Sequence, residues 1–266
     1  MSQLFDRYAP IIANASETEI RSDVTLRSRL ALSRSKDLVV SYAPFEHIER
    51  GAKVVIVGIT PGEQQVRNAL LEARRQLISG ASHAIALEKA KIFASFSGPM
   101  RTNLVAMLDH VGLHRWAGLG SMAELWTGRS DLVHFASALR YPVFVNGGNY
   151  SGQPSMTATP VLRELLDTCL REEAVALSKA IWIPLGPKAT QGIEWIIQQG
   201  ALDRNNALIG LPHPSGASGE RIKYFLGQKH RKDLSVKTEP VRLDAARERL
   251  TAQILSLCRA EAKHPA

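Results

Sequence analysis

Short apolar runs rich in β-branched residues recur along the chain, and each is followed by turn-forming residues. They span residues 54–57 before Gly58, 143–145 before Asn146, 181–183 before Gly186, and 207–209 before Pro212. Continuous apolar runs of this length are typical of strands that are buried on both faces of a parallel sheet. We therefore expect four such strands.

Helical patterns lie between these runs. One helix is predicted over Glu63–Ile78, another is expected to begin at Thr159-Pro160, and a third over Gly219–Phe225. Alternation of strands and helices predicts an α/β fold, a three-layer α/β/α sandwich with a central, mainly parallel four-stranded sheet. We expect a single domain over residues 1–266, with an N-terminal extension (about 1–35) and a C-terminal helix (about 240–262) packed on its core.

Three segments rich in glycine, proline or asparagine follow predicted strands. They are residues 58–62, 146–149 and 211–216. In an open parallel sheet, ligands bind in the crevice outside the carboxyl ends of the strands. We therefore expect these segments to converge on one pocket, although residues 147–157 are also rich enough in turn formers to form an ordinary surface loop.

Two of these segments carry candidate chemistry. The GITPG loop (Gly58, Ile59, Thr60, Pro61 and Gly62) is a strand-to-helix turn that presents free N–H groups, although a GxxPG sequence alone usually marks only a tight turn. The HPSG loop (His213, Pro214, Ser215 and Gly216) holds a histidine on a stiff backbone. A neutral imidazole held in this way can donate a hydrogen bond to a developing negative charge, but a structural histidine is an equal alternative.

Composition narrows the class of protein. The net charge of +8 favours a polyanionic partner, although many basic proteins bind no nucleic acid. Two cysteines far apart support neither a disulfide framework nor a cysteine-ligated metal cluster. The chain contains no apolar run of about 18 residues, so the sequence predicts no membrane-spanning helix. We expect a cytoplasmic, monomeric protein without metal or cofactor.

Taken together and in this order, the motifs resemble those of the uracil-DNA glycosylase superfamily. The resemblance covers about residues 53–225: a GxxPG loop after the first strand, an asparagine after a later strand, and an HPS motif near the end. Two further stretches are similar to the superfamily, residues 96–98 with the helix up to Arg115, and residues 183–189. The resemblance implies a monofunctional DNA glycosylase, which hydrolyses the N-glycosidic bond of a flipped-out pyrimidine and leaves an abasic site.

The resemblance also implies roles for individual residues. Phe96 would stack on the flipped base, Asn146 would read its edge, and His213 would stabilise the leaving base. The residues of the GITPG loop would help to form the base pocket. Alternatives remain open, because Phe96 is equally interpretable as a core aromatic residue, Asn146 as a turn residue, and Asn149 as the base-reading asparagine instead.

The GITPG loop departs from the superfamily pattern at its two variable positions. Members of the superfamily carry Asp, Asn or Glu there to orient the attacking water, whereas this chain has Ile59 and Thr60. The water would then be held by Thr60, by Gln64 or Gln65, or by backbone groups, and Glu63 is the nearest carboxylate.

The last position of this loop bears on the substrate. The strict uracil enzymes have a tyrosine where this chain has Gly62, so the pocket is open to a larger base. One hypothesis is therefore a C5-modified cytosine, hydroxymethylated or glucosylated, in phage DNA, removed as an antiviral defence. Uracil removal in base excision repair is an alternative, and a catalytically weak DNA-binding module is another.

A basic segment follows the HPSG loop directly. Together with Ser215 and Gly216, its cations are candidates for contacts with DNA phosphates, with a solvated basic face as the alternative. These cations are Arg221, Lys223, Lys229, Arg231 and Lys232. No bulky residue follows the HPSG loop to fill the gap left by a flipped base, because Ala217 and Ser218 stand there.

Overall fold

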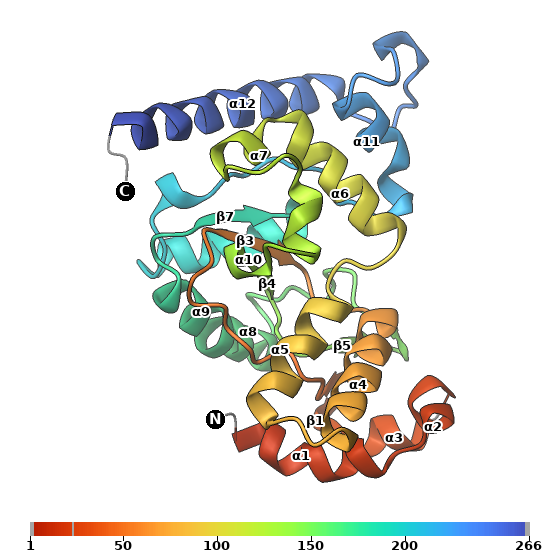
Figure 1. Ribbon diagram of the computed structural model, residues 1–266. Helices are drawn as coiled ribbons and strands as arrows, with labels where there is room; N and C mark the ends of the chain where they lie inside the picture. Colours follow the sequence, from red (N-terminus) through yellow and green to blue (C-terminus); the bar gives the residue numbers. More distant parts are fainter. Residues whose placement is uncertain (1–2, 23, 264–266) are drawn as a thin grey trace.

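A parallel three-stranded sheet lies at the centre of the molecule (Figure 1). The computed structural model describes residues 3–22 and 24–263. Strand β3 (Val54–Gly58) lies between β4 (Val133–Ser137) and β7 (Ile181–Pro184), and both pairings are parallel. All five residues of β3 are buried, which explains its unbroken apolar sequence.

Helices cover both faces of this sheet. Val54 and Ile56 pack on one face with α6 (Pro99–His110), α7 (Leu113–Trp116), α11 (Gly219–Phe225) and α12 (Pro240–Lys263). Val55 and Val57 pack on the other face, with α8 (Pro160–Leu165), the π-helical turn Leu166–Leu170, α9 (Arg171–Ala176) and α10 (Gly186–Gln198). The prediction of a mixed α/β fold with a parallel sheet is confirmed.

The expected four-stranded parallel sheet does not form among the described residues. The run at 207–209 contributes one parallel bridge, between Ala207 and Trp182, and Leu208 N–H donates to the Trp182 carbonyl at 2.8 Å. Gly210, at φ +136°, then turns the chain away from the sheet. The run at 143–145 is a strand, but five residues separate it from β4, too few for a parallel crossover.

That strand belongs to a second, antiparallel sheet in the order β1-β2-β5-β6. Its strands are β1 (Ala31–Ser35), β2 (Leu38–Ser41), β5 (Val143–Val145) and β6 (Gly148–Asn149). The helices near this sheet in Figure 1 are α1 (Gln3–Asn14), α2 (Glu17–Ser22), α3 (Val24–Arg29), α4 (Glu63–Ile78) and α5 (His83–Ala94). Apolar residues of α1, α4, α5 and β2 share one core with Val55 and Val57.

Short 3₁₀ turns complete the structure, at Met122–Trp126, Ser130–Leu132, Arg204–Asn206, Gly216–Ser218 and Arg231–Asp233. The predicted helices Glu63–Ile78 and Gly219–Phe225 are present with the bounds expected. Among the described residues, every helix is too short or too polar to cross a bilayer.

Candidate active site

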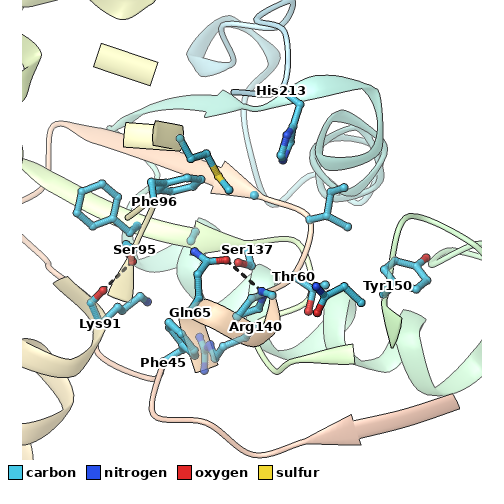
Figure 2. A pocket seen from close by; sticks show the side chains of 18 of the residues that line it. Phe45, Thr60, Gln65, Lys91, Ser95, Phe96, Ser137, Arg140, Tyr150 and His213 are labelled. Atoms are coloured by element: carbon cyan, nitrogen blue, oxygen red, sulfur yellow. Dashed lines mark hydrogen bonds between the residues drawn. The ribbon is translucent and has the colours of Figure 1, made fainter. Parts of the chain in front are cut away.

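A pocket of about 290 Å³ opens where β3 and β4 end (Figure 2). The whole GITPG loop lines it, because β3 ends at Gly58 and the chain then turns into α4. Ala138 N–H donates to the Gly58 carbonyl at 2.9 Å, and Leu139 N–H donates to the Ile59 carbonyl at 2.9 Å. The segment after β4 therefore fixes the loop at the sheet edge where ligands bind in α/β folds.

Thr60 and Glu63 do not act as free catalytic groups in this geometry. The Thr60 hydroxyl donates to the Tyr141 carbonyl at 3.0 Å and accepts from Val143 N–H at 3.2 Å, so it ties the loop to the segment after β4. The Glu63 carboxylate forms an ion pair with Arg67 at 2.7 Å and is not among the residues that line the pocket. The expectation that these two residues activate water is therefore not supported.

His213 lines the same pocket from the HPSG loop. Ser215 N–H donates to His213 Nδ1 at 3.3 Å, so in the neutral ring the proton lies on Nε2. Burial lowers the pKa of His213 below the ordinary histidine value, which favours this neutral form at pH 7. His213 Nε2–H has no hydrogen-bond partner within the described chain and remains available as a donor.

Two contacts fix the HPSG loop in place. Asn103 Nδ2 on α6 donates to the Pro214 carbonyl at 2.9 Å, and Gly186 N–H donates to the Leu211 carbonyl at 3.0 Å. Gly186 has φ +79°, and a Cβ at this position would lie 3.1 Å from His213 Cβ. Glycine is therefore required here by both the backbone angle and the close approach of His213.

An aromatic wall forms another side of the pocket. The Phe96 ring lies 5.9 Å from the Phe135 ring, and Phe135 stacks on Trp126 at 4.9 Å. Phe96 has φ +47°, a strained angle for a bulky residue. Trp126 Nε1–H donates to the Ser95 carbonyl at 3.1 Å and Arg101 Nε–H to the Phe96 carbonyl at 3.3 Å, which holds this backbone in place.

Of the two candidate asparagines, Asn149 lies in the pocket and Asn146 does not. Asn146 is exposed at φ +51° in the hairpin turn between β5 and β6, a conformation that asparagine tolerates. Asn149 lines the pocket, and its Oδ1 accepts from Glu63 N–H at 2.9 Å at the start of α4. The Asn149 amide group lies beside Gly62, and its Nδ2 group is a hydrogen-bond donor.

The predicted basic segment lies on α11 and the turn that follows it, and its cations do not line the pocket. Lys229 pairs with Glu220 at 2.7 Å, and Arg221 Nη2 donates to the Lys237 carbonyl at 3.2 Å. Lys223, Arg231 and Lys232 are exposed. Ser215 is half-buried and Gly216 is exposed, next to the pocket residue His213.

Sequence reasoning missed a charged cluster that also lines the pocket, formed by Lys91, Arg140 and Glu173. Arg140 Nε donates to Glu173 Oε1 at 3.0 Å, and Lys91 Nζ lies 3.7 Å from the same oxygen. Lys91 Nζ also donates to the His47 carbonyl at 2.7 Å. A lysine at an inward position of the otherwise apolar buried face of α5 was the available signal.

His134 lies beside this cluster, and its Nε2 is 3.4 Å from Glu173 Oε2. Burial lowers the pKa of Lys91 to about 8, although Glu173 opposes that shift, and burial also lowers the pKa of His134 to about 4. Burial alone raises the pKa of Glu173, but the neighbouring Lys91 and Arg140 outweigh it and bring the pKa below its usual range. At pH 7 the cluster therefore holds two cations and one carboxylate, beside a neutral His134.

No group of three or more His, Cys, Asp and Glu side chains in the described ranges is arranged to hold a metal ion. Cys169 and Cys258 are free thiols.

Comparison with known proteins finds a relative in Bacillus subtilis. The protein of Bacillus subtilis (strain 168) named "Uncharacterized protein YoxB" is 35% identical over 232 residues, which cover 86% of this chain and 90% of that protein. No family model matches the chain, and no solved structure matches it.

Proposed function

The chain belongs to the same family as YoxB, whose name states no activity, and we propose from the pocket itself that it is a DNA glycosylase of the uracil-DNA glycosylase superfamily. The observation that carries the proposal is the convergence of the GITPG loop, Phe96 and the free Nε2–H of His213 on one pocket. On this proposal the uracil-DNA glycosylase-like fold acts as a monomer on DNA in the cytoplasm.

The reaction begins when a pyrimidine nucleotide is flipped out of the DNA and its base enters the pocket. Breaking the bond between N1 and C1′ leaves the electron pair on the base and an oxocarbenium-like charge on the sugar. His213 Nε2–H donates to a base oxygen on which the negative charge accumulates. Water then adds to C1′, and the proton that it loses is taken up by the anionic base, which leaves an abasic site and a free neutral base.

Binding of the base is supported by the other walls of the pocket. The Phe96 and Phe135 rings offer an apolar surface for stacking, and the Asn149 side-chain amide offers a hydrogen bond to the edge of the base. We assign base reading to Asn149, because Asn146 lies outside the pocket.

Activation of the water is the weak part of this site. Thr60 is already a hydrogen-bond donor to protein, and Glu63 is paired with Arg67 outside the pocket. Stabilisation of the leaving base therefore supplies most of the catalysis. The same feature keeps open the alternative of a catalytically weak DNA-binding module.

The substrate that suits the pocket best is a C5-modified cytosine, hydroxymethylated or glucosylated, and its presence in phage DNA would make the protein an antiviral defence. Gly62 itself has no side chain to close the pocket, and the atoms nearest to a Cβ at this position belong to Asn149, at 3.7 Å and beyond. The volume of about 290 Å³ equals that of roughly ten water molecules at ~30 Å³ each, more than a bare pyrimidine needs. Uracil in base excision repair is the alternative, because the donors of His213 and Asn149 also suit its two carbonyl oxygens.

A product assay tests the proposal. The protein is incubated with DNA that contains uracil and with DNA that contains hydroxymethylated or glucosylated cytosine, and alkali-labile abasic sites are measured. We expect such sites with the wild type and not with His213→Ala. Binding of both DNAs without any abasic site would establish the binding module and reject the enzyme.

A further inference from the structure

The charged cluster of Lys91, Arg140 and Glu173 is not required by the mechanism above, yet it lines the same pocket. Its members come from α5, from the segment after β4 and from α9, and their side chains are at most 7% exposed. Buried ion pairs are weak contributors to stability, because the cost of desolvation offsets most of the attraction. Their position at a pocket therefore suggests a ligand.

One acceptor in the cluster is unsatisfied. Glu173 Oε2 is buried and accepts no hydrogen bond of good geometry; the nearest donor, His134 Nε2–H, is 3.4 Å away. A buried carboxylate oxygen without a donor is costly, so the cluster has capacity for one more donor. Lys91 Nζ lies 3.7 Å from the other carboxylate oxygen, Oε1, and its three N–H groups are donors next to Glu173.

The π-helical turn Leu166–Leu170 places Glu173 here. The Cys169 carbonyl at this turn accepts from Arg140 Nη2 at 3.1 Å, and α9 with Glu173 begins directly after it. A π-helical turn inserted between two α-helical segments often marks a functional site.

The orientation of a bound base directs its substituent toward this cluster. The C2 and C5 atoms of a pyrimidine lie on opposite corners of the ring, so a base whose O2 faces His213 points its C5 substituent away from His213. Figure 2 shows Lys91 and Arg140 on the side of the pocket away from His213.

We infer that the charged cluster is a specificity subsite that binds a hydroxyl-bearing substituent on C5 of the flipped base, an inference that rests on the proposed glycosylase function. A hydroxyl group both donates and accepts, so it suits the Glu173 carboxylate together with an N–H of Lys91 or Arg140. A methyl group or a hydrogen atom offers neither a donor nor an acceptor to these side chains.

The test compares matched DNA duplexes that carry uracil, thymine or 5-hydroxymethyluracil, and the corresponding cytosine series. We expect the wild type to prefer the hydroxymethyl base over the methyl base in kcat/KM by roughly 10- to 100-fold, the value of a hydrogen bond to a charged group. Glu173→Gln keeps the shape of the side chain and should bring this ratio close to one. Glu194→Gln, in the exposed ion pair with Arg204, is the matched control and should leave the ratio unchanged.

A merely structural role predicts a different result. If Glu173→Gln lowers the rates on all bases by the same factor, or if the wild type does not distinguish hydroxymethyl from methyl bases, the inference is wrong while the glycosylase proposal stands. If Glu173→Gln does not fold, Lys91→Met replaces it. The ratio of kcat/KM between the hydroxymethyl and the methyl base is measured on the wild type and does not depend on any variant.

Free bases separate failure of the subsite from failure of the enzyme. If no DNA is cut, the glycosylase proposal fails, and the unfolding temperature of the protein is then measured with free 5-hydroxymethyluracil and with thymine. Greater stabilisation by 5-hydroxymethyluracil, lost in Glu173→Gln, supports the subsite. Equal stabilisation, or none, overturns it.

Discussion

Two histidines in this molecule, His213 and His134, accept the same kind of hydrogen bond at Nδ1 but differ in what lies next to Nε2. His213 Nδ1 accepts from Ser215 N–H and His134 Nδ1 accepts from Glu49 N–H, both at 3.3 Å. Burial lowers the pKa of both rings, so both are neutral at pH 7 with the proton on Nε2. A backbone donor on Nδ1 thus fixes the same tautomer twice.

The difference lies in what Nε2 meets. His134 is 1% exposed in β4, and its Nε2 faces Glu173 at 3.4 Å. His213 lies in a loop, and its Nε2–H is left for a ligand. The neutral imidazole of His134, whose Nε2 faces protein, therefore has a structural role. We assign a catalytic role to His213, whose Nε2 faces the pocket.

The largest effect expected from this comparison is on the rate of reaction. His213→Ala removes the donor to the leaving base and should lower kcat by roughly 10²- to 10³-fold, the usual loss for one such donor. Its unfolding temperature should fall only modestly, because the substitution removes one hydrogen bond within the protein, from Ser215 N–H to Nδ1, and Nε2–H has no hydrogen-bond partner among the described residues. Single-turnover rates and thermal unfolding measure both quantities, and an unchanged rate would remove His213 from the mechanism.

The next effect concerns stability and belongs to His134. Its pKa is about 4 when folded and 6.5 when unfolded, so between these values only the unfolded chain binds the proton. The free energy of unfolding should therefore fall by roughly 3 kcal/mol from pH 6.5 to pH 4 because of this group. Urea unfolding at several pH values should show that decline reduced in His134→Gln.

Exposed His230 supplies the control for that experiment. The His230→Gln variant should keep the full pH dependence of the wild type. Equal declines in the wild type and in His134→Gln would contradict the neutral, buried state of His134.

A smaller effect should follow from displacing His213 without removing it. Gly186→Ala and Gly200→Ala both place a side chain at positive φ, at a cost of about 1 kcal/mol. Only Gly186 lies against His213, since nothing lies within 4 Å of a Cβ at Gly200. We expect a roughly tenfold lower kcat for Gly186→Ala alone. Equal rates in the two variants would show that the position of His213 does not limit catalysis.

The smallest effect concerns the basic segment. Lys223→Ala should weaken binding to all DNA sequences alike and reduce the slope of log K against log salt by about one. Lys179, exposed just before β7 at the opposite end of the sheet, is the matched control. A slope that Lys223→Ala leaves unchanged would remove α11 from the DNA surface.

The sequence predicted what is contiguous along the chain. Residues 54–57 form an unbroken apolar run and Glu63–Ile78 carries its own helical periodicity, so β3 and α4 were identified correctly. β4 was missed because His134 interrupts its apolar run, and the compensating Glu173 lies far along the chain. The direction of β5 depends on how the five residues between β4 and β5 turn the chain. The pattern of apolar and polar residues in this segment does not predict that turn.

The candidate site divides in the same way. The GITPG and HPSG loops are contiguous motifs, and the structure brings them together in one pocket. Lys91, Arg140 and Glu173 are separated in sequence, and although Lys91 falls on the apolar face of α5, Arg140 and Glu173 look like ordinary surface charges. Only their mutual compensation in three dimensions makes their burial possible.

The most direct test of the central claim measures the two products together. The wild-type protein is mixed with DNA that contains the candidate bases, and the free base and the abasic sites are quantified over time by mass spectrometry. The account predicts equal amounts of free pyrimidine and abasic site, formed by the wild type and strongly reduced in His213→Ala. Release of base that His213→Ala leaves unchanged, or no release from any DNA that the protein binds, would contradict it.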